Sequence, residues 1–278
     1  MNPRSDTIAV HSPAPALLES VAALTRLVDH DSHPEEVVRT VRGWGQRLCG
    51  RIAPDASVLN RLRMLNFFFF QELGFHGEHG DGGDWADAGC LHRVIERRAG
   101  MGLPLSILYM EIGRAIGLKL VGLEFPGGFL VKLVCTGRVL VIDVSEQGAT
   151  LSAQQLRSRL GQPADDGGAG AASDPLQRCL RGVPEDDIPV RILQALGRRH
   201  QQAGRWAEAL AVQSELVQRL PGDRGALLDR ADLYERLDCV RAAALDLKAC
   251  LQLDPGAADA AALRSRWARL QQRANRLN

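Results

Sequence analysis

The stretch Arg98–Asp143 reads RAGMGLPLSILYMEIGRAIGLKLVGLEFPGGFLVKLVCTGRVLVID, and it decides the fold. Its first part carries large apolar residues at helical spacing from Leu103 to Ile116. Pro104 fits the first turn of a helix, where its missing N–H costs no hydrogen bond. Gly117 fits the C-terminal end of the same helix. We therefore expect a buried helix over residues 103–116.

The second part of this stretch predicts three short strands. Residues 118–124 are rich in β-forming side chains. Residues 129–135 and 138–144 flank Thr136-Gly137, which suits a two-residue hairpin turn. A helix that precedes an antiparallel sheet predicts an α+β fold.

Helical patterns also fill the chain before this stretch. Residues 13–51 contain two of them, and Pro34 fits the start of the second. Residues 55–73 predict one further helix. Its run Phe67–Phe70 is apolar on all sides, so we expect this helix to be buried on most of its faces.

A repeat occupies the C-terminal third of the chain. Ala209 and Ala243 lie 34 residues apart, and so do Pro221 and Pro255. This period, with small residues inside paired helices and a proline after each pair, is typical of tetratricopeptide repeats. A plain bundle of helical hairpins is the alternative that the pattern leaves open.

These patterns divide the chain into three parts. We assign residues 13–160 to the α+β domain and residues 183–277 to an all-α, tetratricopeptide-like domain. Between them, residues 161–182 include a run rich in Gly, Ala and Asp, which predicts a linker or mobile loop because it has few large apolar side chains.

Composition narrows the classes of function. The chain has 278 residues and a formal net charge of +1, which gives no electrostatic reason to expect nucleic acid or an anionic membrane as a partner. The N-terminal segment has no signal-peptide pattern, and no run of eighteen apolar residues predicts a spanning helix. The six cysteines are scattered, so we expect reduced thiols and a cytoplasmic location.

Several short motifs occur in a fixed order along the chain. They are RRAGMGLPLS at 97–106, GL at 117–118, FPGGFLV at 125–131, ID at 142–143 and LLDRADLYERLDCVRAAALDLKACLQLDP at 227–255. Together these motifs resemble the bacterial SirB-one family over roughly Leu59–Leu270. The resemblance implies a transglutaminase- or papain-like core, made of a helix and an antiparallel sheet, that carries C-terminal tetratricopeptide repeats.

The resemblance also implies where a Cys-His-Asp site would lie, and two of its three residues are missing. The nucleophile position corresponds to about Gly102, and the histidine position to Gly128. Asp143 remains at the orienting position. An aspartate without an imidazole to orient performs no general-base work. We therefore expect a non-catalytic core, with no cofactor and no metal, that acts through its repeats.

Two other arrangements remain open. A displaced cysteine hydrolase or acyl transferase site could combine Cys90 with His92 or His79. Polar residues of the glycine-rich loop at 74–89 could hold a metal ion, although a flexible loop is the simpler interpretation. These residues are His76, Glu78, His79 and Asp81.

The repeats determine the expected partner. Paired helices of this type form a concave surface that suits a protein or peptide. We expect a protein or peptide partner, no nucleic acid and no membrane, and the sequence leaves the oligomeric state undetermined.

Overall fold

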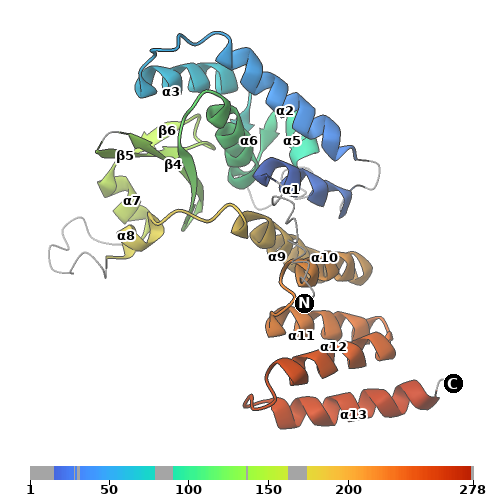
Figure 1. Ribbon diagram of the computed structural model, residues 1–278. Helices are drawn as coiled ribbons and strands as arrows, with labels where there is room; N and C mark the ends of the chain where they lie inside the picture. The colour runs from blue at the N-terminus through green and yellow to red at the C-terminus, as the bar shows by residue number, and fades with distance from the viewer. Residues whose placement is uncertain are drawn as a thin grey trace, which may run out of the picture.

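The computed structural model describes residues 16–27, 29, 32–78, 90–135, 137–161 and 174–276. An α+β lobe contains the sheet, and a stack of helices extends from it toward the C-terminus (Figure 1). The predicted α+β fold with a C-terminal helical region is confirmed. Among the described residues, no helix combines the length and apolar character needed to cross a bilayer.

The N-terminal helices surround a central helix. Helix α1 (Leu17–Leu24) continues into a short 3-10 turn, η1 (Thr25–Leu27), and α2 (Pro34–Cys49) follows. Pro34 begins α2, and two glutamates in its first turn face the positive end of the helix dipole. Both α1 and α2 pack against α6 (Gly102–Ala115), whose large apolar side chains are almost all buried.

The helix predicted over 55–73 is present, but its second half has a different geometry. Helix α3 (Val58–Asn66) begins at the N-cap Ser57, and the chain then widens into a π-helix, η2 (Phe67–Glu72). The N–H of Leu73 donates to the carbonyl of Phe68 at 2.9 Å, a bond that spans five residues rather than four. Phe68, Phe69 and Phe70 are buried as expected, but Phe67 is 55% exposed.

The sheet has four antiparallel strands in the order β3-β4-β5-β6. They are β3 (Leu120–Phe125), β4 (Gly128–Cys135), β5 (Arg138–Asp143) and β6 (Ala149–Leu151). The three predicted strands are thus confirmed within two residues at each end, whereas β6 was not predicted. Alternate residues of β4 point to opposite faces, so Val131 joins the core beneath α6 while Leu130 joins a second, smaller core.

Short elements complete this lobe. Helix α5 (Leu91–Arg97) lies in the sequence between the two-residue strands β1 (His76–Gly77) and β2 (Ala99–Gly100), which pair in parallel. Helices α7 (Ala153–Arg159) and α8 (Pro175–Cys179) place Leu156 and Leu176 in the smaller core on the far face of the sheet.

The predicted linker at 161–182 contains one short helix. Residues 162–173 lie outside the described residues, but 175–179 form helix α8. Residues 180–183, here called the strap, then run along the outer edge of β3. Lys132 Nζ donates to the Leu180 carbonyl at 2.7 Å, and the Val183 N–H donates to the Gly122 carbonyl at 2.8 Å.

Five helices form the C-terminal stack. They are α9 (Asp187–Gln202), α10 (Trp206–Arg219), α11 (Arg224–Arg236), α12 (Val240–Leu253) and α13 (Ala260–Arg276). The 34-residue period is visible in the backbone, because Gly204 and Asp238 both adopt left-handed φ angles, of 69° and 57°, at the same place in successive helix pairs. Ala209 and Ala243 are fully buried between the paired helices.

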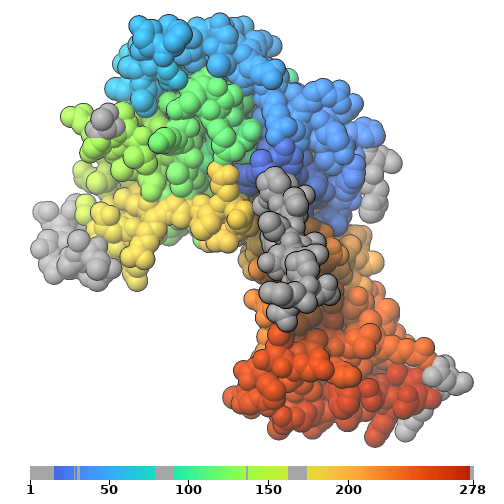
Figure 2. Space-filling view, viewed as in Figure 1, coloured from blue at the N-terminus to red at the C-terminus, as the bar shows by residue number. Residues whose placement is uncertain are grey.

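The two parts share a hydrophobic core. Helix α9 packs against α1, and η1 contacts α10. One continuous cluster of buried side chains runs from Leu17 in α1 to Ala274 in α13. In the space-filling view, the face shown is hollowed between the region of α8 and the repeat helices (Figure 2).

Candidate functional site

The structure brings Gly102, Gly128 and Asp143 together around one pocket of about 350 Å³. Gly102 begins α6, Gly128 begins β4 and Asp143 ends β5. The other charged groups on the wall are Glu78, Glu146 and Arg159. Three positions that are far apart in the sequence therefore form one site, here called the core pocket.

The position of Gly102 has little room for a side chain. A Cβ atom placed there would lie 2.9 Å from Ser145 Oγ and 3.5 Å from the Phe129 carbonyl oxygen. The hydroxyl of Ser145 thus occupies the space above the first turn of α6, where the resemblance places a nucleophile. A larger residue at this position requires the Ser145 side chain to rotate away.

Gly128 is constrained by its backbone rather than by its neighbours. A Cβ atom there would meet nothing within 4 Å, but its φ angle is 151°. Residues with a side chain rarely adopt this φ. A histidine at position 128 would therefore have space but would strain the turn between β3 and β4.

Asp143 already has two hydrogen-bond donors. The backbone N–H of Ser145 donates to Oδ1 at 3.1 Å, and Arg159 Nη2 donates to Oδ2 at 2.8 Å. The Asp143 side chain is only 7% exposed, whereas that of Arg159 is 32% exposed. An arginine from α7 thus partners the carboxylate that would orient an imidazole.

Sequence reasoning missed both Arg159 and Ser145. One signal for the helix that carries Arg159 was present, because Ser152 and Gln155 form a capping box at the start of α7. Nothing in the sequence indicates that the arginine at the end of α7 reaches back to Asp143.

The alternative pair, Cys90 and His92, lies elsewhere. Cys90 is buried at the N-cap of α5. His92 lines a separate pocket of about 270 Å³, where its Nε2 lies 3.2 Å from Asp29 Oδ2. Residues two apart on a helix point in different directions. Neither Cys90 nor His92 lines the core pocket.

The loop residues suggested for a metal are only partly described. His79 and Asp81 lie outside the described residues. His76 Nδ1 lies 3.3 Å from the Gly74 carbonyl, and Glu78 pairs with Arg97. Within the described ranges, no group of three or more potential ligands is placed to hold a metal ion.

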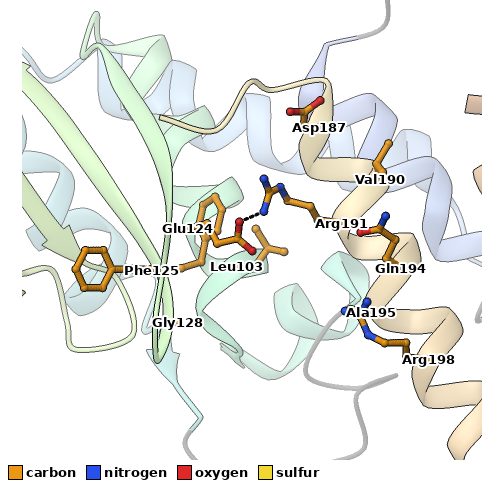
Figure 3. A pocket seen from close by; sticks show the side chains of 11 residues that line it. Leu103, Glu124, Phe125, Gly128, Asp187, Val190, Arg191, Gln194, Ala195 and Arg198 are labelled. Carbon is orange, nitrogen blue, oxygen red and sulfur yellow. Dashed lines mark hydrogen bonds and ion pairs between the residues drawn. The ribbon is translucent and has the colours of Figure 1, made fainter. Parts of the chain in front are cut away.

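A larger pocket, of about 680 Å³, lies between the β3–β4 end of the sheet and helix α9 (Figure 3). We call it the interlobe groove. It shares Gly128 and Phe129 with the core pocket. At its other end it shares Gln194 and Arg198 with a third pocket, of about 410 Å³, between α9, α10 and α11. The interlobe groove is therefore a neighbour of both the core pocket and this pocket in the repeats.

Helix α6 against the antiparallel sheet, with an aspartate at the end of β5, defines a transglutaminase-like core, and the paired helices define a tetratricopeptide module. Comparison with known families agrees: the model described as "Transglutaminase-like superfamily" matches residues 35–194, and a tetratricopeptide repeat model matches residues 196–268.

The chain belongs to the UPF0162 family of transglutaminase-like proteins. A UPF0162 protein of Xylella fastidiosa strain Temecula1 is 34% identical over 70% of this chain and 68% of its own length. The UPF0162 protein PA3419 of Pseudomonas aeruginosa is 28% identical over 91% of this chain and 90% of its own length. These relatives do not carry the SirB-one name, which is thus not confirmed.

The similarity also reaches a eukaryotic protein. Human F-box only protein 21 is 26% identical over 48% of this chain, a match that covers 24% of its own length. No solved structure matches the chain significantly.

Proposed function

We propose that this protein is a non-catalytic, transglutaminase-like scaffold that binds a protein or peptide partner through its repeat module, in a regulatory role. The pairing of Asp143 with Arg159, beside glycines at both remaining positions of the site, carries this proposal. A Cys-His-Asp mechanism needs a thiolate, an imidazole that takes up its proton and a carboxylate that orients the imidazole. Among the described residues that line the core pocket, only the carboxylate is present.

The test is an assay for turnover by the full chain. The protein would be incubated with an amine donor and a glutamine-containing protein, and separately with a fluorogenic peptide substrate. We expect no turnover above that of the buffer. Turnover that is lost in Cys90→Ala and retained in Cys239→Ala, which changes an exposed cysteine remote from the core pocket, would overturn the proposal.

A cysteine hydrolase or acyl transferase with a displaced site is the second candidate. The position of Cys90 at the start of α5 favours it, because a helix N-terminus stabilises a thiolate. Its burial and the position of His92 beside Asp29 weigh against it. A thiol-reactive probe that labels Cys90 faster than the exposed Cys239 would support this candidate.

Two further assignments remain proposals. Membership of the SirB-one family rests on the ordered motifs from Arg97 to Pro255. A cytoplasmic location rests on the scattered cysteines and would be tested by fractionation of cells that produce the full chain.

A further inference from the structure

At Glu124, no described residue pairs with the outer edge of β3. In the β3–β4 ladder, Phe125 pairs with Gly128 across the two-residue turn, and Leu123 pairs with Leu130. The strap bonds to the outward carbonyl of Gly122. Because the direction of backbone groups alternates along a strand, the N–H and C=O of Glu124 also point outward. No described residue forms a hydrogen bond with them.

This free edge faces the interlobe groove. The strap turns away after Val183 and leads into α9, so it covers Gly122 but leaves Glu124 open. Arg191, Gln194 and Arg198 lie on the side of α9 that faces the groove (Figure 3). Unpaired edge strands are ready templates for another strand, and peptides use them in this way.

The groove has apolar side chains on both of its walls and an arginine, Arg198, at one end. The apolar part of the groove's lining includes Leu103, Phe129 and Val190. Arg191 is engaged by the Glu124 carboxylate, whereas Arg198 has no carboxylate partner among the described residues. Arg198 also lines the neighbouring pocket, so a ligand that passes from one pocket to the other meets its guanidinium.

The neighbouring pocket has the opposite charge. Asp223 and Asp229 line it, and burial, followed by the negative charges of Asp232 and Asp223, raises the pKa of Asp229 above its usual value. A second acidic group would be repelled there. An acidic side chain of a ligand is therefore favoured at Arg198 and disfavoured beyond it.

We propose that an extended, acidic peptide segment of a partner protein pairs with β3 at Glu124 and lies in the interlobe groove. This inference rests on the proposed scaffold function. The peptide places an apolar side chain toward Leu103 and Val190, and an aspartate or glutamate against Arg198. The α+β lobe is then half of the binding site rather than a support for the repeats.

The experiment uses the full chain and a library of random seven-residue peptides displayed on phage. The tightest peptide would be synthesised and titrated by fluorescence anisotropy. We expect the selected sequences to contain one acidic residue next to an apolar one. A library without any binder tighter than about 100 µM, or binders without an acidic residue, would overturn the proposal.

A matched pair of variants tests the strand edge. Glu124→Pro removes the outward N–H without breaking a bond to β4, whereas Glu124→Ala keeps that N–H and removes only the side chain. We expect about tenfold weaker binding for the proline variant than for the alanine variant, with both thermally as stable as wild type. Equal affinities would overturn strand pairing. If the proline variant is unstable, N-methylation of alternate peptide amides gives the same test, because only one of the two sets is bonded.

A second matched pair tests the charge. Arg198→Glu should weaken binding at least tenfold, whereas Arg269→Glu, at an exposed position of α13, should leave it unchanged. Dimerisation that Arg198→Glu abolishes would instead assign the groove to a second copy of this chain. If only substitutions in α11 and α12 weaken peptide binding, this inference is overturned and the scaffold function is retained. Enzymatic turnover would overturn the scaffold function itself.

Discussion

Asp143 in the α+β lobe and Asp246 in the repeats are similar in their burial and in the type of residue that they pair with. Their side chains are 7% and 8% exposed, and each pairs with an arginine sixteen residues away in sequence. They differ in their surroundings. Arg230, in α11, donates two hydrogen bonds to the carboxylate of Asp246, in α12, from Nε at 2.8 Å and from Nη2 at 2.7 Å. Arg159 reaches Asp143 with Nη2 alone, on the wall of the core pocket.

This comparison separates an ion pair enclosed between two helices from an ion pair that borders a pocket. The hydrogen bond to Asp246 raises the pKa of Arg230, which keeps the pair charged inside the repeat stack. The Asp143 pair borders an open pocket and shares its carboxylate with a backbone N–H. Burial and pairing are thus common to both aspartates, and only the pocket beside Asp143 distinguishes the two positions.

The largest loss of stability is expected from breaking the ion pair between Asp246 and Arg230 in the repeats. Asp246→Ala leaves the Arg230 guanidinium between two helices without its partner, which should lower the free energy of unfolding by about 3 kcal/mol. Chemical denaturation of the full chain would measure it. Asp232→Ala, whose side chain is 56% exposed, is the control and should cost less than about 1 kcal/mol. Equal losses would show that the Asp246 pair has no special structural role.

The second effect tests whether backbone strain keeps the histidine out of the core pocket. Gly128→His should destabilise the protein by about 2 kcal/mol, because its φ of 151° disfavours any side chain. Gly43→His places the same side chain in free space on α2, a regular helix, and should be neutral or stabilising. Combining Gly128→His with Gly102→Cys should give no turnover, since Asp143 stays paired with Arg159. Turnover by that double variant would contradict this reading of the site.

Breaking the pair in the core pocket should cost less than breaking the one in the repeats. Asp143→Ala is expected to lose about 1.5 kcal/mol, because the partly exposed Arg159 can turn to water. A double-mutant cycle with Arg159→Ala, measured by thermal unfolding, would isolate the coupling between the two side chains. A coupling above that of Asp246 and Arg230 would reverse the comparison.

The smallest loss of stability is expected at a tyrosine, and the chain has only two. Tyr109 is buried in α6 and donates to Asn66 Oδ1 at 2.5 Å, so Tyr109→Phe should cost about 1 kcal/mol. Burial also raises the pKa of Tyr109 well above its usual value. The phenol therefore keeps its proton to a higher pH in the folded protein than in the unfolded chain. As a result, the free energy of unfolding should fall as the pH rises above about 10. Tyr109→Phe should remove part of that alkaline loss, whereas Tyr234→Phe, in the repeats, should not.

Much of the architecture could be predicted from periodicity. The helix at 103–116, the hairpin that follows and the 34-residue repeat all appear where apolar spacing placed them. The missed elements are short. Strand β6 has three residues and α8 has five, so neither is long enough to show a period. The π-helical turn at Phe67–Glu72 has no local signal either, because four consecutive phenylalanines fit several helical geometries.

The site could be predicted in outline only. Gly102, Gly128 and Asp143 do line one pocket, as the family resemblance implies. The partners that define its chemistry, Arg159 and Ser145, depend on how α7 and the turn after β5 fold back, which no spacing encodes. Glu124 and Arg198 are brought to one groove by the packing of α9 beneath the sheet edge, a tertiary contact between segments more than sixty residues apart.

Because of the strap, the chain cannot be cut between its two lobes without exposing surfaces that are covered in the full chain. It bonds to β3 through Gly122 and to β4 through Lys132, and it continues directly into α9, which packs on α1. A gene fragment that ended after Gly182 would encode a sheet with a bare edge and an N-terminal helix with an uncovered apolar face. Such a product is expected to aggregate. The α+β lobe is therefore expected to need the repeat helices on the same polypeptide, and expressing the shortened chain beside the full chain would check this.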